Sequence, residues 1–307
     1  MKILIELPTW LGDAVMTTPA IENLIDFYNG AYFTIVGSRV STQAFKNHPK
    51  VVELIVLEKK YYDIYKIVRD LEKFDVFFSF RASFRSKIFK LLLPSQNKYQ
   101  FNGKKFNHGH QVQRYNDFIN HSIGKQYNPR QLTLYHRQNK VNYKKKLLGI
   151  NPGGSYGGSK RWYPEEFAKV AIELSSEYDI FIFGGKDEID IASNIEKFLI
   201  RRQIINYQNL VGKTTIEGLI NKISLLDLFI TNDSGPMHIA AAFKIPTISI
   251  FGPTSFQETA QWMNKKSKII SKDLECQPCM ERECPLKHHN CMKMIKAEDV
   301  LMALTTL

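Results

Sequence analysis

The chain has 307 residues, of which 44% are hydrophobic and 23% are charged, as in an ordinary globular protein. At roughly 100–200 residues per domain, this length indicates two domains. No apolar run approaches the ~20 residues of a membrane span. The first apolar run, Ile3 to Leu7, is interrupted by Glu6 and is too short for a signal peptide. We therefore expect a cytoplasmic protein without disulfide bonds.

The net charge of +12 is distributed unevenly along the chain. Residues 1–150 carry 24 Lys and Arg against 11 Asp and Glu, whereas residues 151–307 carry 18 against 19. Between Val76 and Lys146 there are 15 basic residues and one acidic residue. A solvated basic surface is one interpretation. The other is a face for an anionic partner, such as nucleic acid, a phosphorylated glycolipid or an acidic membrane.

In the first half of the chain, short β-rich runs alternate with helical stretches. The apolar runs predict strands over Lys2–Leu7, Tyr32–Val36, Val51–Val56 and Val76–Ser79. The helical patterns predict helices over Ala14–Tyr28, Tyr62–Lys73, Phe84–Leu92 and Gln111–Ile123. The polar, basic stretch Tyr127–Lys146 shows little periodicity and is predicted to be an interdomain linker.

The same alternation resumes in the second half. It predicts strands over Leu147–Asn151, Asp179–Phe183, Leu228–Thr231 and Thr247–Phe251. It predicts helices over Pro164–Glu177, Ile189–Ile200, Thr215–Lys222, Ser234–Phe243 and Ala297–Thr306. Two successive β-α-β series indicate an α/β protein with two Rossmann-like, doubly wound parallel sheets, in domains 1–146 and 147–307, facing each other across a cleft.

The loop from Pro8 to Asp13, directly after the first strand, is the first candidate site. Ligands bind at the carboxyl ends of the strands in such sheets, so this loop is expected to face the cleft. Asp13 begins the next helix, where a carboxylate is a favoured N-cap. Alternatively, Asp13 is a general base that takes a proton from an incoming hydroxyl. A carboxylate has two oxygens, so the two roles are compatible.

A glycine-rich loop from Asn151 to Trp162 follows the first strand of the second half. Glycines let backbone N–H groups approach a phosphate closely, and Lys160 adds a compact positive charge. The loop is not a Walker loop, because the G-K-[S/T] ending is absent. A flexible glycine loop without a ligand is the alternative.

Residues 231–238 form a third candidate site, between an apolar strand and an Ala-rich helix. The N–H groups of Ser234 and Gly235, together with the positive end of the helix, predict an anion site. Asp233 would repel a phosphate, so we expect it to order the turn or to accept hydrogen bonds from donor hydroxyls. His238 either donates to a phosphate or is a satisfied core histidine.

The cysteines are confined to the C-terminal tail, with the spacing C-x2-C-x4-C-x6-C. They are Cys276, Cys279, Cys284 and Cys291, and His288 and His289 lie close by. Clustered Cys and His residues are typical of a structural zinc knuckle. The spacing is not that of a standard finger, however, and four free thiols in a packed tail are the alternative.

Two phosphate-type loops in one half and a candidate base in the other indicate a cleft enzyme. A diphosphate leaving group would be held by Lys160 and a helix dipole. The sequence contains no Asp-x-Asp motif, by which many sugar transferases hold a divalent ion to the donor. We therefore expect no metal at the site and no other cofactor.

Together these segments resemble glycosyltransferase family 9, the bacterial heptosyltransferases, over nearly the whole chain. The most specific matches are Trp10-Leu-Gly-Asp13, Pro152-Gly-Gly with Lys160-Arg-Trp162, Asn232-Asp-Ser-Gly-Pro-Met-His238 and Phe251-Gly-Pro-Thr254. The cysteine-rich tail looks like that of the type II enzymes of the family. Leu7 also favours type II, because some type I relatives have Lys there. The resemblance implies a GT-B fold and inverting, metal-independent transfer.

The resemblance also implies roles for individual residues. Asp13 matches the family's proposed catalytic base. The implied donor-binding residues are Gly154, Ser155, Tyr156, Lys160, Asp187, Thr214, Asp233, Ser234, Gly235 and His238. Residues 81–86 look like the family's Ser-Phe-[Lys/Arg]-Ser segment. The implied acceptor-binding residues are Trp10, Arg81, Ser83 and Arg85.

The implied reaction moves L-glycero-D-manno-heptose from ADP-heptose to the first heptose of the lipopolysaccharide inner core. A different core step within the family is the alternative. The implied partners are the ADP-heptose donor, a phosphorylated lipid A–Kdo–heptose acceptor, and the anionic inner membrane, at whose cytoplasmic face a monomer would work.

Two other classes of protein are disfavoured by the sequence. The basic stretch lacks a helix-turn-helix, RRM or KH signature, so no nucleic-acid partner is expected. No Gly-x-Gly-x-x-Gly motif follows the first strand, which argues against a Rossmann oxidoreductase.

Overall fold

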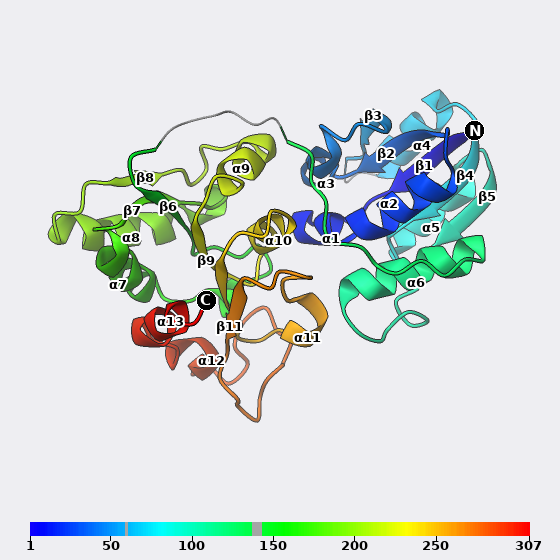
Figure 1. The fold of residues 1–307 in the computed structure, drawn as a ribbon. Coiled ribbons are helices and arrows are strands. Elements are labelled where there is room, and N and C mark those ends of the chain that lie inside the picture. The colour runs from blue at the N-terminus through cyan, green and yellow to red at the C-terminus, as the bar shows by residue number, and fades with distance from the viewer. Residues whose placement is uncertain (59–60, 137–142) are drawn as a thin grey trace. The chain divides into compact units, whose positions relative to one another are not determined.

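The computed structural model describes residues 1–58, 61–136 and 143–307. The chain divides into two compact units, Met1–Arg137 and Gln138–Leu307 (Figure 1). The boundary expected after residue 146 falls at the start of strand β6 (Lys146–Asn151). Among the described residues, no helix combines the length and the apolar character needed to cross a bilayer.

Within residues 1–58 and 61–136, the first unit contains a five-stranded sheet in the order β3-β2-β1-β4-β5, and every strand pair is parallel. Its strands are β1 (Lys2–Glu6), β2 (Tyr32–Gly37), β3 (Val51–Val56), β4 (Phe74–Ser79) and β5 (Ser95–Gln100). Its helices are α1 (Leu11–Met16), α2 (Thr18–Phe27), α3 (Arg39–Thr42), α4 (Tyr61–Asp70), α5 (Phe84–Leu92) and α6 (Gln111–Ile123), with a short 3-10 turn η1 (Gln43–Phe45). The central strand β1 buries Ile3, Leu4 and Ile5 completely, as expected for a strand covered on both faces.

The helix predicted over Ala14–Tyr28 is two helices, α1 and α2, which meet at Thr17. Pro19 lies in the first turn of α2 and has no N–H to donate back to Val15. The hydroxyl of Thr18 donates to the Val15 carbonyl instead, at 2.8 Å. The break is therefore caused by the proline, and a threonine side chain replaces the missing hydrogen bond.

The predicted linker, residues 127–146, is partly wrong. Residues 137–142 lie outside the described part of the chain, but residues 127–135 pack on α2 and α6. Leu132 and Leu134 are buried, and the carbonyl of Tyr127 accepts hydrogen bonds from Asn116 and Asn120. The polar composition suggested a solvated linker, but Asn side chains donate to the Tyr127 carbonyl and two alternate leucines are buried.

Within residues 143–307, the second unit contains a six-stranded parallel sheet in the order β11-β10-β9-β6-β7-β8. Besides β6, its strands are β7 (Tyr178–Ile182), β8 (Tyr207–Asn209), β9 (Leu228–Asn232), β10 (Thr247–Ile250) and β11 (Ser267–Ile270). Its helices are α7 (Pro164–Leu174), α8 (Ile189–Arg201), α9 (Ile216–Ile223), α10 (Gly235–Ala242), α11 (Phe256–Thr259), α12 (Asn290–Lys293) and α13 (Ala297–Leu304), with 3-10 turns η2 (Gly158–Lys160) and η3 (Lys186–Glu188).

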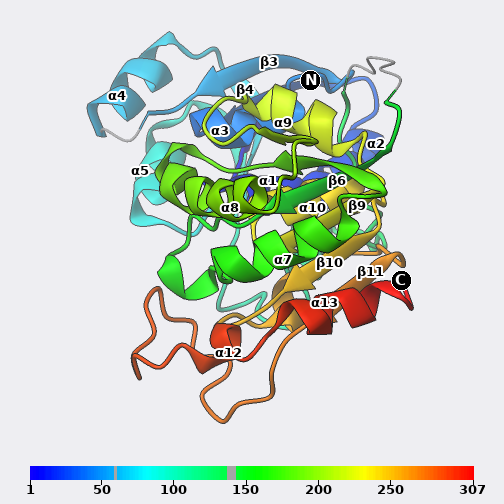
Figure 2. The ribbon, with the colours of Figure 1, turned by 90° about the vertical axis from the view of Figure 1, so that its left-hand side faces the viewer.

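Helices cover both faces of the second sheet. Helix α7 packs beside α8, and the C-terminal helix α13 packs on α7 (Figure 2). Helices α9 and α10 pack against each other on the opposite face (Figure 1). The indole N–H of the buried Trp162 donates to the carbonyl of Ile295 at 2.9 Å, which ties the end of the glycine loop to the segment before α13.

Three strands that the sequence pattern did not predict, β5, β8 and β11, lie at sheet edges. Edge strands have a single neighbour and bury less side-chain area, so their sequences need no continuous apolar run. Strand β5, Ser-Gln-Asn-Lys-Tyr-Gln, has no fully buried residue. Such strands exist because a neighbouring strand supplies hydrogen bonds, which local sequence does not reveal.

Candidate functional site

Each sheet has one point where the strand order reverses, and the predicted motifs lie at these two points. In the first unit the reversal falls between β1 and β4, where Glu6 pairs with Ser79. In the second unit it falls between β6 and β9, where Asn151 pairs with Thr231. Open α/β sheets bind ligands in the crevice at the carboxyl ends of these strands.

In the second unit, the side chain of Glu188 holds the glycine loop after β6. Its two carboxylate oxygens each accept one backbone N–H at 2.6 Å, from Gly154 and from Gly185. A Cβ atom at Gly153 would lie 2.0 Å from this carboxyl group, so the loop approaches Glu188 too closely for any other residue. The side chain of Glu188 thus joins the loops after β6 and β7.

Asn232 fixes both ends of the same loop. Its side-chain amide donates to the carbonyl of Pro152 at 2.7 Å, and its side-chain oxygen accepts from the N–H of Trp162 at 3.2 Å. Neither Asn232 nor Glu188 was among the predicted site residues. Asn232 is part of the Asn232-Asp-Ser-Gly motif recognised in the sequence. For Glu188, the only local indication of a role at the site is the glycine pair that precedes it, Gly184 and Gly185.

Lys160, at the end of the loop, forms a largely buried ion pair with Asp233. Its ammonium lies 2.5 Å from Oδ2 of Asp233, and the Thr254 hydroxyl donates to the same oxygen at 2.6 Å. The ammonium also lies 4.9 Å from the ring centre of Tyr156, a cation–π contact. Asp233 therefore joins the glycine loop to the segment after β10. Thr254, a further member of this cluster, was not among the predicted site residues.

The third candidate segment begins helix α10, with Ser234 as the N-cap residue. The Ser234 hydroxyl does not cap the helix; it lies 3.1 Å from both the Asn151 side-chain nitrogen and the Thr231 hydroxyl. His238 is buried in this helix, one turn after Gly235. Serine, glycine and the helix N-terminus are thus placed beside the Lys160–Asp233 pair, and the group can bind an anion.

The remaining predicted donor residues lie on loops around this group. Ser155 is exposed in the glycine loop, and Asp187 is exposed in η3 after β7. Thr214 is half-buried after β8. The loops after β7 and β8 are joined by the N–H of Gly212, which donates to the carbonyl of Gly184 at 3.0 Å. The fold therefore brings all the predicted donor residues to the carboxyl edge of one sheet.

The cysteine-rich tail packs directly on the glycine loop. The N–H and the hydroxyl of Ser159 donate to the carbonyls of Arg282 and Glu281, at 3.1 and 2.6 Å. The hydroxyl of Tyr156 donates to the carbonyl of Met280, and the His289 ring lies 2.8 Å from the Ser159 carbonyl. The tail therefore contacts the loop through one backbone–backbone hydrogen bond and three contacts between a side chain and a backbone carbonyl.

All four cysteines belong to the described part of the chain and are free thiols. They line one small cavity of about 20 Å³ together with His288 and His289. Burial, and then the neighbouring thiols, raise the pKa of Cys291 to about 11. Within residues 1–58, 61–136 and 143–307, no group of three or more His, Cys, Asp or Glu side chains is arranged to hold a metal ion.

In the first unit, Asp13 is the third residue of α1, not its N-cap. The N-cap residue is Trp10, which is 52% exposed and makes no side-chain cap. The predicted capping role of Asp13 is therefore wrong, because α1 begins earlier than its sequence pattern indicated. Asp13 is half-buried near Tyr115 of α6, whose pKa is raised well above 10 by burial and, next, by the Asp13 carboxylate.

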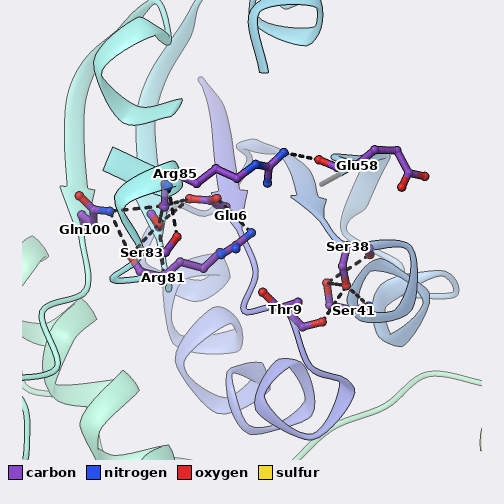
Figure 3. Close-up of polar contacts among 11 residues, drawn as sticks. Glu6, Thr9, Ser38, Ser41, Glu58, Arg81, Ser83, Arg85 and Gln100 are labelled. Atoms are coloured by element: carbon purple, nitrogen blue, oxygen red, sulfur yellow. Dashed lines mark hydrogen bonds and ion pairs between the residues drawn. The ribbon is translucent and has the colours of Figure 1, made fainter. Parts of the chain in front are cut away.

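The predicted acceptor segment, residues 81–86, follows the end of β4 and runs into α5; Arg81, Ser83 and Arg85 are labelled in Figure 3. Ser83 is the N-cap of α5, and its hydroxyl accepts from the N–H of Ser86 at 3.2 Å. Arg85 donates to the carbonyl of Glu58, and Arg81 lies 3.7 Å from Glu6. Glu6 was not predicted as a site residue. Its signal was a carboxylate inside an otherwise apolar strand.

Two doubly wound parallel sheets, each with motif-bearing loops at its switch point, are typical of glycosyltransferases with the GT-B fold. The family model described as glycosyltransferase family 9 (heptosyltransferase) matches residues 78–290. Lipooligosaccharide heptosyltransferase 2 of Campylobacter jejuni is 44% identical over 310 residues, covering 98% of this chain and 96% of the relative. The chain belongs to glycosyltransferase family 9.

Solved structures agree with this assignment at the level of the fold. Escherichia coli ADP-heptose LPS heptosyltransferase II superimposes with a TM-score of 0.82 at 20% identity, covering 100% of this chain and 98% of that one. E. coli heptosyltransferase WaaC with ADP gives 0.77 at 16% identity, covering 100% and 99%. The predicted GT-B fold is confirmed.

Proposed function

We propose that this enzyme is a heptosyltransferase II: it transfers heptose from ADP-L-glycero-D-manno-heptose to the first heptose of the lipopolysaccharide inner core. The observation that carries this proposal is the 44% identity, over almost the full length of both chains, to a lipooligosaccharide heptosyltransferase 2. The proposed transfer inverts the anomeric centre and uses no metal ion.

In the proposed mechanism, Asp13 takes the proton from an acceptor hydroxyl, and the resulting oxygen attacks the anomeric carbon of the donor in a single displacement. The bond to ADP breaks as the new glycosidic bond forms. The position of Asp13 supports this role, because it lies in the first helical turn after β1, at the switch point of its sheet.

ADP leaves with its charge spread over the diphosphate, and the second unit supplies the compensating charge. Lys160 is held in place by Asp233 and by the ring of Tyr156. The N-terminus of α10, at Ser234 and Gly235, adds backbone N–H groups and a helix dipole. In this proposal, Lys160 and the N-terminus of α10 together stabilise the departing diphosphate without a metal ion.

The basic first unit is proposed to bind the acceptor, a phosphorylated lipid A–Kdo–heptose, and to contact the anionic inner membrane as a monomer. Helix α5 supports the membrane contact: Phe84 and Leu91 are 70% and 78% exposed, two turns apart on one face. The exposed Lys87 lies between them. Exposed apolar side chains flanked by lysine are typical of surfaces that bind anionic lipid.

The reaction is tested by following ADP release from ADP-heptose with a series of truncated core acceptors. Heptose transfer should require an acceptor that ends at the first heptose. Turnover with an acceptor lacking that heptose, or only with a longer one, would assign the enzyme to another core step of the family. No turnover with any ADP-heptose and acceptor pair would reject the proposal.

The role of Asp13 is tested by the Asp13→Ala variant, which should lose transfer while its affinity for ADP stays nearly that of the wild type. Normal turnover would exclude Asp13 as the base. Membrane contact is tested by sedimentation with vesicles that contain anionic lipid. The double variant with Phe84→Ser and Leu91→Ser should bind these vesicles more weakly, and equal binding would exclude this face of α5.

A further inference from the structure

Glu6 is an acidic residue at an unusual place, the carboxyl end of the central strand β1. The three residues before it are fully buried aliphatic side chains, and Glu6 itself is 1% exposed. Burying a carboxylate is costly unless it is hydrogen-bonded and paired with a positive charge. Its contacts therefore indicate why the chain keeps an acid here.

The two carboxylate oxygens of Glu6 have different partners (Figure 3). Oε2 accepts hydrogen bonds from the hydroxyls of Ser79, at 2.6 Å, and Ser86. Oε1 lies 3.7 Å from Nη1 of Arg81. One oxygen thus anchors the carboxylate to β4 and α5, and the other faces a guanidinium.

The same cluster fixes the backbone of Arg81. Its N–H donates to the Ser79 hydroxyl at 3.2 Å, and its carbonyl accepts from the side-chain amide of Gln100 at 3.0 Å. Among the described residues, Glu6 is the only ion-pair partner of the Arg81 guanidinium, which is 16% exposed. A guanidinium has five N–H donors, so one contact at 3.7 Å leaves donors for a bound oxyanion.

We propose that Glu6 is a positioning residue: it holds Arg81 in the orientation that binds a phosphate group of the acceptor. The proposal rests on the function proposed above. The location agrees with it, because Glu6 and Ser79 are paired at the switch point of the first sheet, where ligands bind in doubly wound folds.

A purely stabilising role fits the electrostatics of Glu6 poorly. Burial raises its pKa above 4.5, although the Ser79 and Ser86 hydrogen bonds, Arg81 and Arg85 act in the opposite direction. An acid with a raised pKa favours folding most when protonated, and this contribution is lost as the pH rises through the raised value. At neutral pH, replacing the carboxylate by an amide is therefore expected to leave stability unchanged or slightly higher.

The experiment compares Glu6→Gln with wild type in acceptor kinetics, donor kinetics and thermal unfolding. We expect the acceptor KM to rise about tenfold or more, as for the loss of a hydrogen-bonded charged group, while kcat and the donor KM stay within about twofold. With a dephosphorylated acceptor, wild type and Glu6→Gln should have the same KM. The proposal would be overturned if the KM changed equally for the phosphorylated and the dephosphorylated acceptor. It would also be overturned if the donor KM and the acceptor KM changed equally.

Glu22→Gln is the matched control, because Glu22 is a largely buried carboxylate of the same unit that contacts His48 at 3.1 Å and Tyr135 at 3.2 Å. It should leave the acceptor KM unchanged. A rise in acceptor KM as large as that of Glu6→Gln would show a general effect of losing a buried acid, and would also refute the positioning role.

Two further measurements keep the inference testable. If Glu6→Gln does not fold, Arg81→Lys replaces the guanidinium instead, and it should show the same phosphate-dependent rise in acceptor KM; an unchanged KM would refute the proposal. Calorimetric titration with the phosphorylated acceptor measures binding without turnover. Wild type that binds this acceptor but transfers no heptose would reject the proposed reaction alone. Equal affinity of wild type and Glu6→Gln would reject the role of Glu6 alone.

Discussion

The contact between the glycine loop and the cysteine-rich tail can be tested at Gly157. A Cβ atom there would lie 2.3 Å from the carbonyl oxygen of Arg282 and 2.9 Å from its Cα atom. Those atoms belong to the backbone and are held by the N–H of Ser159. Normal contact between such atoms needs more than 3 Å, so the Gly157→Ala variant must separate loop and tail by roughly 1 Å.

Overpacking of this kind costs about 1–3 kcal/mol. Because the displaced loop carries Lys160, we expect the Kd for ADP to rise about 5- to 100-fold in Gly157→Ala, at about 1.4 kcal/mol per factor of ten. The matched control is Gly158→Ala, because a Cβ at Gly158 meets no atom within 4 Å. Isothermal titration with ADP measures both. Equal affinities in the two variants would refute the conclusion that the tail supports the glycine loop.

Three further predictions concern single side chains. Thr254→Val removes the 2.6 Å hydrogen bond to Asp233 and should weaken ADP binding about fivefold in the same titration, whereas unchanged affinity would exclude this residue from the donor site. With a pKa of about 11, Cys291 is a thiolate in only about one molecule in a thousand at pH 8. Peptide mapping after iodoacetamide treatment should therefore show Cys291 as the last of the four cysteines to react, and its rate should increase as the pH rises toward 11. Early labelling of Cys291 would contradict its burial. Asn116→Ala removes one of the hydrogen-bond donors to the Tyr127 carbonyl. It should lower the free energy of unfolding, measured in urea, by about 1–3 kcal/mol without changing the affinity for ADP. Unchanged stability would mean that Asn116 does not anchor the segment 127–135.

The sequence pattern was most reliable where burial is continuous. Strands β1 and β9 at the sheet centres contain the apolar runs Ile3–Ile5 and Leu228–Ile230 because helices cover both faces, so their positions followed from the local sequence pattern. The glycine loop and the start of α10 were found for a similar reason: backbone that approaches an anion requires glycine and a helix N-terminus in fixed order.

The polar framework behind these loops was less visible. The sequence does not reveal what Glu188 and Glu6 contact, because their partners Gly154 and Ser79 lie 34 and 73 residues away along the chain. The packed segment 127–135 looked like a linker for the same reason: its hydrogen bonds are made with α2 and α6. Local composition does not record which distant donors will meet a carboxylate or a carbonyl.

The sequence by itself thus determined the class of fold and the positions of the motif-bearing loops after β1, β6 and β9, since each depends on short-range pattern and backbone geometry. Only the tertiary structure decided that Lys160 pairs with Asp233, that the cysteine-rich tail supports the glycine loop, and that Glu6 faces Arg81. These contacts arise from strand order, which brings residues far apart in the chain to the carboxyl edge of one sheet.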